Sequence, residues 1–139
     1  MKERKAALPP FRALDPALST AERLLTGGDP RLSTVVNLLP DERAAATALN
    51  DVLAGCGASP RLRADGDAWR VVHVATAGRD TELVVAACGL AALVAVAGWR
   101  RLKECETCRQ PFVDRTNGCT RRWCTPHRPR VTPLPGRRK

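Results

Sequence analysis

Four residues near the C-terminus have the types and spacing of a metal site. Two residues separate Cys105 from Cys108, fifteen separate Cys108 from Cys124, and two separate Cys124 from His127. A Cys-x2-Cys turn lets two thiolates bind one ion from the same side, and a second ligand pair then closes a tetrahedral shell, which suits zinc. Four protein ligands leave no open position. The spacing therefore predicts one structural Zn²⁺ bound by Cys105, Cys108, Cys124 and His127.

Cys119 is an alternative ligand. A four-cysteine site that includes Cys119 would leave His127 free. We favour His127 because Cys124-x2-His127 repeats the two-residue spacing of the first pair. In addition, Cys119 follows a predicted turn at Asn117-Gly118, which would direct it away from that pair.

Positive charge is concentrated in the same part of the chain. Residues 1–99 carry 11 Lys or Arg and 11 Asp or Glu, whereas residues 100–139 carry 12 and 3, so the whole net charge of +9 lies there. A neutral body with a basic end favours a polyanionic partner, and nucleic acid ahead of a membrane; the alternative is a tail that only aids solubility. We predict duplex DNA as the partner. The residues expected to contact it are Arg109, Arg115, Arg121, Arg122, Arg128, Arg130, Arg137, Arg138 and Lys139.

The remaining sequence predicts a mainly α-helical fold with a small β-hairpin. Apolar periodicity and capping residues indicate helices at about 21–26, 30–39 and 42–54. Asp65-Gly66 suits a hairpin turn, so a hairpin is expected at about 60–75. A long helix from Glu82 to about Lys103 follows, and its many small residues would let neighbouring helices approach closely.

The predicted organisation has four parts. Residues 1–16 form a flexible lead-in, residues 17–103 a helical domain, residues 104–130 a zinc finger, and residues 131–139 a basic flexible tail. Within the finger, Pro111–Val113 and Arg121–Trp123 are expected to be a strand and its return strand. The order of knuckle, hairpin and second ligand pair predicts a treble-clef-like finger.

Other functional classes have weaker support. Leu83–Trp99 is uncharged but short for a membrane span, so we expect a buried helix, and Met1–Arg12 lacks the apolar segment of a secretory signal. We therefore expect a cytoplasmic protein with reduced cysteines. A four-ligand metal site without a nearby acid or base predicts that it is not an enzyme, although thiol chemistry at Cys119 stays open.

The segment from Leu102 to Arg130 resembles the CGNR zinc finger. The resemblance is carried by Cys105-x2-Cys108, by the run from Pro111 to Gly118, and by Arg121-Arg122-Trp123-Cys124. Where that family has its namesake Cys-Gly-Asn-Arg, this chain reads His127-Arg128-Pro129-Arg130.

The preceding residues are similar to the ABATE domain that accompanies this finger. The similarity lies in Ala48-Leu49-Asn50 and in the run from Arg61 to Trp69. Together the two resemblances imply a shortened ABATE-like domain in a bacterial, stress-linked transcription regulator that binds DNA through its finger. Two alternatives stay open: RNA or ribosome binding through the same finger, and a protein-interaction or accessory role in which zinc is purely structural.

Overall fold

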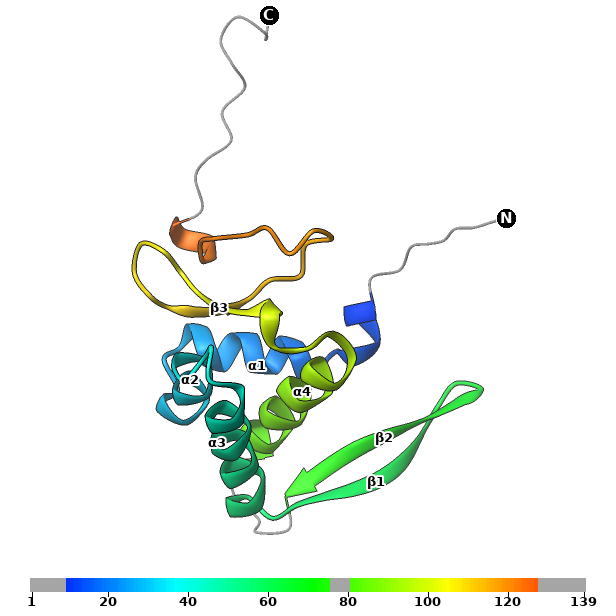
Figure 1. Cartoon of the computed structure of the whole chain (residues 1–139). Helices are drawn as coiled ribbons and strands as arrows, with labels where there is room; N and C mark the ends of the chain where they lie inside the picture. The colour runs from blue at the N-terminus through cyan, green and yellow to red at the C-terminus, as the bar shows by residue number, and fades with distance from the viewer. Residues whose placement is uncertain (1–9, 76–80, 128–139) are drawn as a thin grey trace, which may run out of the picture.

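Four helices form the body of the described part of the chain, and two small antiparallel hairpins are attached to it (Figure 1). A computed structural model describes residues 10–75 and 81–127. Its elements are η1 Pro10–Leu14, α1 Ala17–Thr26, α2 Pro30–Asn37, α3 Glu42–Gly55, β1 Ala58–Asp65, β2 Ala68–Ala75, α4 Thr81–Ala97, η2 Trp99–Arg101, β3 Leu102–Glu104, β4 Pro111–Val113 and η3 Thr125–His127. The predicted mainly helical fold with a β-hairpin is confirmed, and β3–β4 adds a second hairpin.

Local capping explains where the first three helices begin. The Asp29 carboxylate accepts hydrogen bonds from the amides of Arg31 and Leu32, and Asp41 accepts one from the amide of Ala44. These bonds satisfy amides that have no partner within their own helix. Helix α1 begins at Ala17, earlier than predicted, because Asp15 accepts a hydrogen bond from the Ser19 amide.

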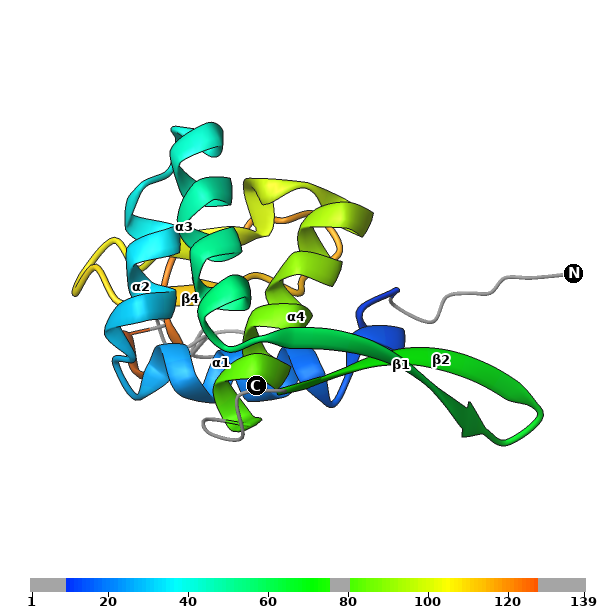
Figure 2. The same cartoon turned by 90° about the horizontal axis from the view of Figure 1, so that it is seen from below.

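Helix α4 packs against α1 and α3, and it contributes more buried residues to the core than any other helix (Figure 2). Gly89 allows the close approach of α1: a Cβ atom added there would lie 2.6 Å from the backbone of Ala17. The expectation that small residues in this helix permit close packing is therefore confirmed. The fully buried large side chains of the helical core are Leu18, Leu25, Leu32, Val35, Val36, Val84, Leu90 and Leu93.

Helix α4 is shorter than predicted. It ends at Ala97, because Gly98 adopts a φ of 76°, a left-handed conformation that interrupts the helix. The chain then forms η2 and β3, and β3 pairs with β4 through Leu102–Val113, Lys103–Phe112 and Glu104–Pro111. The predicted helix over residues 98–103 is thus replaced by a turn and a strand.

Two further predictions differ from the structure. Part of the expected lead-in is ordered, since Pro10–Leu14 is a 3-10 helix whose Phe11 is 4% exposed and belongs to the core. Residues 1–9 lie outside the described part of the chain. The expected return strand at Arg121–Trp123 is also not formed, because among the described residues β4 pairs with β3.

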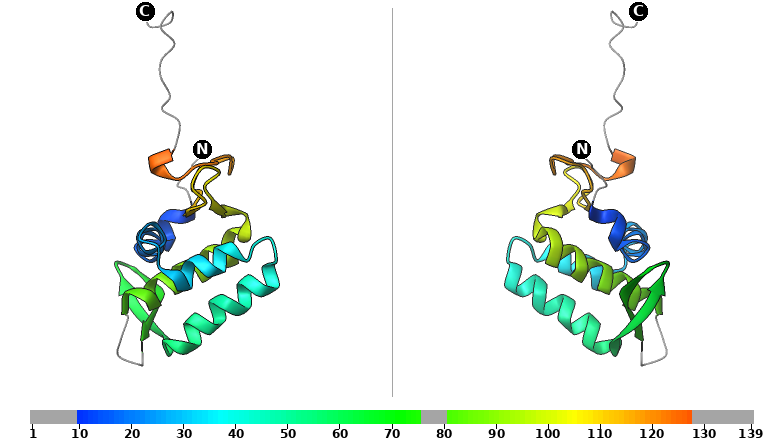
Figure 3. Two further views of the ribbon diagram at one scale, coloured as in Figure 1. Left: turned by 90° about the vertical axis from the view of Figure 1, so that its left-hand side faces the viewer. Right: turned by 90° about the vertical axis from the view of Figure 1, so that its right-hand side faces the viewer.

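The β1–β2 hairpin projects away from the helices (Figure 1), and it lies at the opposite end of the helical body from η3 (Figure 3). Its two-residue turn is Gly66-Asp67, one residue later than predicted, and Gly66 has the positive φ of 64° that such turns require. Among the residues described, no helix is both long and apolar enough to cross a membrane.

We predict that Gly89→Ala destabilises the protein by about 1–3 kcal/mol, because the added methyl group meets the backbone of α1, which cannot move aside independently. Gly55→Ala is the matched control: a Cβ atom added at Gly55 would have nothing within 4 Å, and alanine favours helix. Urea unfolding measures both. Equal stability of the two variants would contradict close packing at Gly89.

Candidate metal centre

The first two cysteines lie on a tight turn between β3 and β4. The Cys105 amide donates to the Gln110 carbonyl at 2.9 Å, and the Arg109 amide donates to the Cys105 carbonyl at 2.8 Å. Arg109 completes the turn with a φ of 66°. These bonds place Cys105 and Cys108 on one side of the loop.

The second ligand pair is brought to the first by the loop that follows β4. The Glu106 amide donates to the Arg122 carbonyl at 3.0 Å, which joins the two segments. Cys124 then starts a short turn in which the His127 amide donates to the Cys124 carbonyl at 3.1 Å.

The ligand atoms of Cys105, Cys108, Cys124 and His127 all lie within 4.8 Å of one another, so these residues could hold a metal ion. The sulfurs of Cys108 and Cys124 are 3.7 Å apart, and the Cys124 sulfur lies 3.1 Å from His127 Nδ1. Tetrahedral zinc with bonds of about 2.3 Å to sulfur needs sulfurs about 3.8 Å apart. The donor set and its spacing therefore fit one such ion.

The pKa values of Cys105 and Cys124 are shifted in opposite directions. Burial raises the pKa of Cys105, but hydrogen bonds from the backbone of Cys108, Cys124 and Thr107 outweigh it and lower the pKa to about 6. Burial raises the pKa of Cys124, and the neighbouring thiols raise it further. A metal ion binds cysteine as the thiolate, so metal binding would release protons and would weaken as the pH falls.

Cys119 lies outside the cluster. Its thiol donates to the Arg100 carbonyl at 3.5 Å, and its backbone has a φ of 55°. Among the described residues, the group that could hold a metal ion is the set with His127 that the sequence favoured. All six cysteines are free thiols.

A buried carboxylate organises the loop between the two ligand pairs. The Asp114 side chain is fully buried and accepts hydrogen bonds from Lys103 Nζ at 2.7 Å, the Thr116 amide at 2.8 Å and the Arg121 amide at 2.8 Å. Burial alone would raise the pKa of Asp114, but Lys103 and the hydrogen bonds from Thr116 and Arg121 hold it well below its usual range. The carboxylate therefore stays ionised inside the protein.

Two cations from the start of the finger bind the same loop. Lys103 Nζ also donates to the carbonyls of Cys119 and Arg121, both at 2.8 Å. The buried Arg101 donates to the carbonyls of Asp114, Thr116 and Asn117. The sequence did not predict that Arg101, Lys103 and Asp114 interact with the same loop. In the sequence, the charged residues of this region indicated only that the C-terminal part of the chain is basic.

The predicted nucleic-acid contacts that the structure describes all interact with other residues of the protein. Arg115 pairs with Asp15 at 2.9 Å and with Glu22 at 2.7 Å, which ties the finger to α1. Arg121 lies over the Phe112 ring at 4.7 Å and donates to the Trp123 carbonyl.

The other two predicted arginines in this region are more exposed. Arg122 pairs with Glu106 at 2.8 Å and lies over the Trp123 ring, while Arg109 pairs with Glu104 at 3.6 Å. The predicted contacts Arg128, Arg130, Arg137, Arg138 and Lys139 lie outside the described residues.

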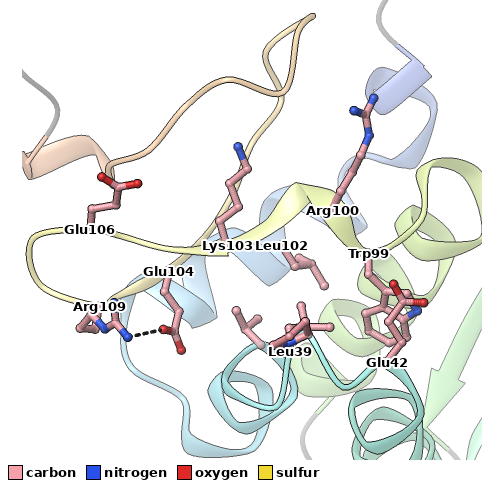
Figure 4. Close-up of a pocket in the computed structure, with 11 residues that line it drawn as sticks. Leu39, Glu42, Trp99, Arg100, Leu102, Lys103, Glu104, Glu106 and Arg109 are labelled. Carbon is pink, nitrogen blue, oxygen red and sulfur yellow. Dashed lines mark ion pairs between the residues drawn. The ribbon is translucent and has the colours of Figure 1, made fainter.

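Two cavities border the finger. One of about 480 Å³ lies between β3 and the α2–α3 connection, with an apolar wall of Leu39, Trp99 and Leu102 and the Glu104–Arg109 pair at its edge (Figure 4). The second, of about 610 Å³, lies beside α1 and is lined in part by Cys108, Cys124 and His127.

The chain matches no protein-family model, and no curated protein matches it significantly.

We predict that Cys119→Ser keeps one metal ion per chain, whereas Cys124→Ser loses it. The reason is that Cys124 belongs to the cluster and Cys119 does not. Elemental analysis of the purified full-length variants measures the stoichiometry. Loss of metal in Cys119→Ser with retention in His127→Ala would show that the four-cysteine site is correct instead.

We predict that Asp114→Asn destabilises the protein by about 3 kcal/mol at pH 7, because it leaves the Lys103 ammonium without its buried counter-charge. The native carboxylate contributes stability above its ordinary pKa of about 3.9 and loses it as the pH falls below that value. The difference between wild type and variant should therefore narrow below about pH 4. Urea unfolding across pH measures this.

The matched control for this prediction is Asp51→Asn, the same chemical change at an exposed position on α3. It should alter stability by less than about 0.5 kcal/mol. Similar effects of the two substitutions would mean that the Asp114 network contributes little.

Proposed function

We propose that the cluster binds one structural Zn²⁺ and that the finger belongs to the treble-clef type. Three thiolates and one imidazole form a ligand set that zinc prefers, and a filled four-ligand shell favours a structural role. The motif resemblance to the CGNR finger and its ABATE-like companion supports the same proposal. The role proposed is therefore not that of an enzyme.

We further propose that the partner is duplex DNA and that the protein acts in the cytoplasm as a transcription regulator. The observation that carries this proposal is the position of basic residues in the sequence. Residues 128–139 contain five Lys or Arg and no Asp or Glu, and they follow directly after the metal ligand His127. A metal site at this point would fix the start of the basic segment on the folded body, and cationic side chains there would displace counterions from DNA phosphates.

A protein partner is the second candidate, and it has its own supporting observation. Arg115, Arg121 and Arg122 are engaged within the finger, which leaves less free positive charge on its folded surface than the sequence suggested. RNA binding by base stacking on the finger has less support, because Arg121 and Arg122 lie over the rings of Phe112 and Trp123.

We predict that a variant with alanine at Arg128, Arg130, Arg137, Arg138 and Lys139 binds duplex DNA more weakly and with a shallower dependence on salt. Each lost phosphate contact reduces the slope of log affinity against log salt by about 0.9. Fluorescence anisotropy with a labelled duplex at several salt concentrations measures this for the full chain.

The control is Arg12→Ala/Arg23→Ala/Arg43→Ala, which removes positive charge from the helical body and should leave the slope nearly unchanged. A zinc-chelated sample tests whether the metal is needed. Absence of DNA binding by the wild-type chain, together with a stoichiometric protein partner in a pull-down, would favour the second candidate.

A further inference from the structure

Cys108 differs from the other two cysteines of the cluster in its exposure. Cys108 is exposed, whereas Cys105 and Cys124 are buried. It lies on the turn between β3 and β4, at the outer edge of the molecule and next to η3 (Figure 1). The cavity of about 610 Å³ beside α1 is also lined by Cys108, so a small molecule in this cavity would contact it. Cys108 is therefore the cysteine of the cluster that a reagent in solution meets first.

Cys124 is in position to react with Cys108. The two sulfurs are 3.7 Å apart, and a small shift of the exposed turn would bring them within bonding distance. The Cys105 side chain is instead fully buried, and its sulfur accepts a hydrogen bond from the Thr107 amide at 3.4 Å. The arrangement therefore favours a reaction of the exposed thiol with Cys124 over one with Cys105.

The loop around the cluster is held by contacts that do not involve the metal ligands. Asp114 accepts hydrogen bonds from Lys103 Nζ and from the amides of Thr116 and Arg121. Val113, at the end of β4, belongs to the core of the helical body. Loss of the metal ligands would therefore leave the helices and the Asp114 network folded, so the site could be emptied and filled again.

We propose that Cys108 is an oxidation site, at which a hydroperoxide joins Cys108 to Cys124 as a disulfide and thereby empties the metal site. The thiolate is both the form of cysteine that binds a metal and the form that acts as a nucleophile. This inference rests on the proposed zinc site and is independent of the proposed DNA partner.

The reaction with hydrogen peroxide has two steps. The Cys108 thiolate attacks one peroxide oxygen, so that an S–O bond forms, the O–O bond breaks and hydroxide leaves. The Cys124 thiolate then attacks the resulting sulfenic acid, which forms the S–S bond and expels a second hydroxide. The two sulfurs together lose two electrons to the peroxide, and both hydroxides take up protons to become water. Only Cys105 and His127 then remain as ligands, too few for a structural zinc site.

The test adds hydrogen peroxide to the purified, zinc-loaded full chain and measures free zinc with a chromogenic chelator. We expect each chain to release its ion while the helical circular dichroism stays unchanged. Trypsin cleaves after Lys103, Arg109, Arg122 and Arg130, so mass spectrometry of the alkylated digest should find residues 104–109 linked to residues 123–130. Addition of a dithiol and zinc should refill the site.

Cys108→His tests the exposed position, because histidine is also a zinc ligand but cannot form a disulfide. We expect this variant to keep its ion and to release it at least about tenfold more slowly in peroxide, since it lacks the reactive thiol. Cys119→Ser is the matched control: Cys119 lies outside the cluster, so this variant should release zinc as fast as the wild type. If Cys108→His does not hold zinc, the disulfide mapped in the wild type decides.

Three results would overturn the inference. Zinc that stays bound in the wild type under peroxide would remove it and leave the proposed metal site intact. A disulfide between Cys105 and Cys108, or a sulfinic acid at Cys108 with no disulfide, would remove the reaction with Cys124. Purified protein that holds no zinc before oxidation would remove both the metal site and this inference.

Discussion

The conformation of the finger depends on one buried ion pair, between the Asp114 carboxylate and the Lys103 ammonium. Burying a carboxylate costs free energy unless the group is paired with a cation and hydrogen-bonded. Asp114 is paired with Lys103 and accepts hydrogen bonds from two backbone amides. The amides belong to Thr116 and Arg121, at the two ends of the loop that leads to Cys124. The pair thereby sets the path by which the second ligand pair returns to the first.

The same interaction connects the metal centre to the helices. Lys103 and Arg101 lie at the beginning of the finger, and Arg101 places its guanidinium against the Phe11 ring at 4.9 Å while donating to the loop carbonyls. Leu102 and Val113 belong to the hydrophobic core that the helices form. On the other side of the loop, Arg115 pairs with Asp15 and Glu22. The finger is thus built onto the helical body, with shared apolar core and ion pairs.

This construction separates two uses of positive charge. The loop and α1 are held in place by Arg101, Lys103 and Arg115. The positive charge of these side chains is therefore engaged in contacts within the protein. The positive charge that we propose to bind a polyanion belongs instead to the residues that follow His127 in the sequence. A count of basic residues cannot make this distinction, because the same residue type serves both purposes.

Local patterns in the sequence determined the ligand set and most helix boundaries. Two-residue spacing selects the candidate ligands Cys105, Cys108, Cys124 and His127, because a short turn limits where their side chains can lie. Helices begin after Asp29 and Asp41, because each carboxylate accepts hydrogen bonds from amides only a few residues further along the chain. The tertiary structure alone decided which charges are buried, that Phe11 joins the core, and that Trp69 is exposed. Those outcomes depend on contacts between residues far apart in the chain, such as Arg115 with Asp15, and such contacts leave no periodic signal in the sequence.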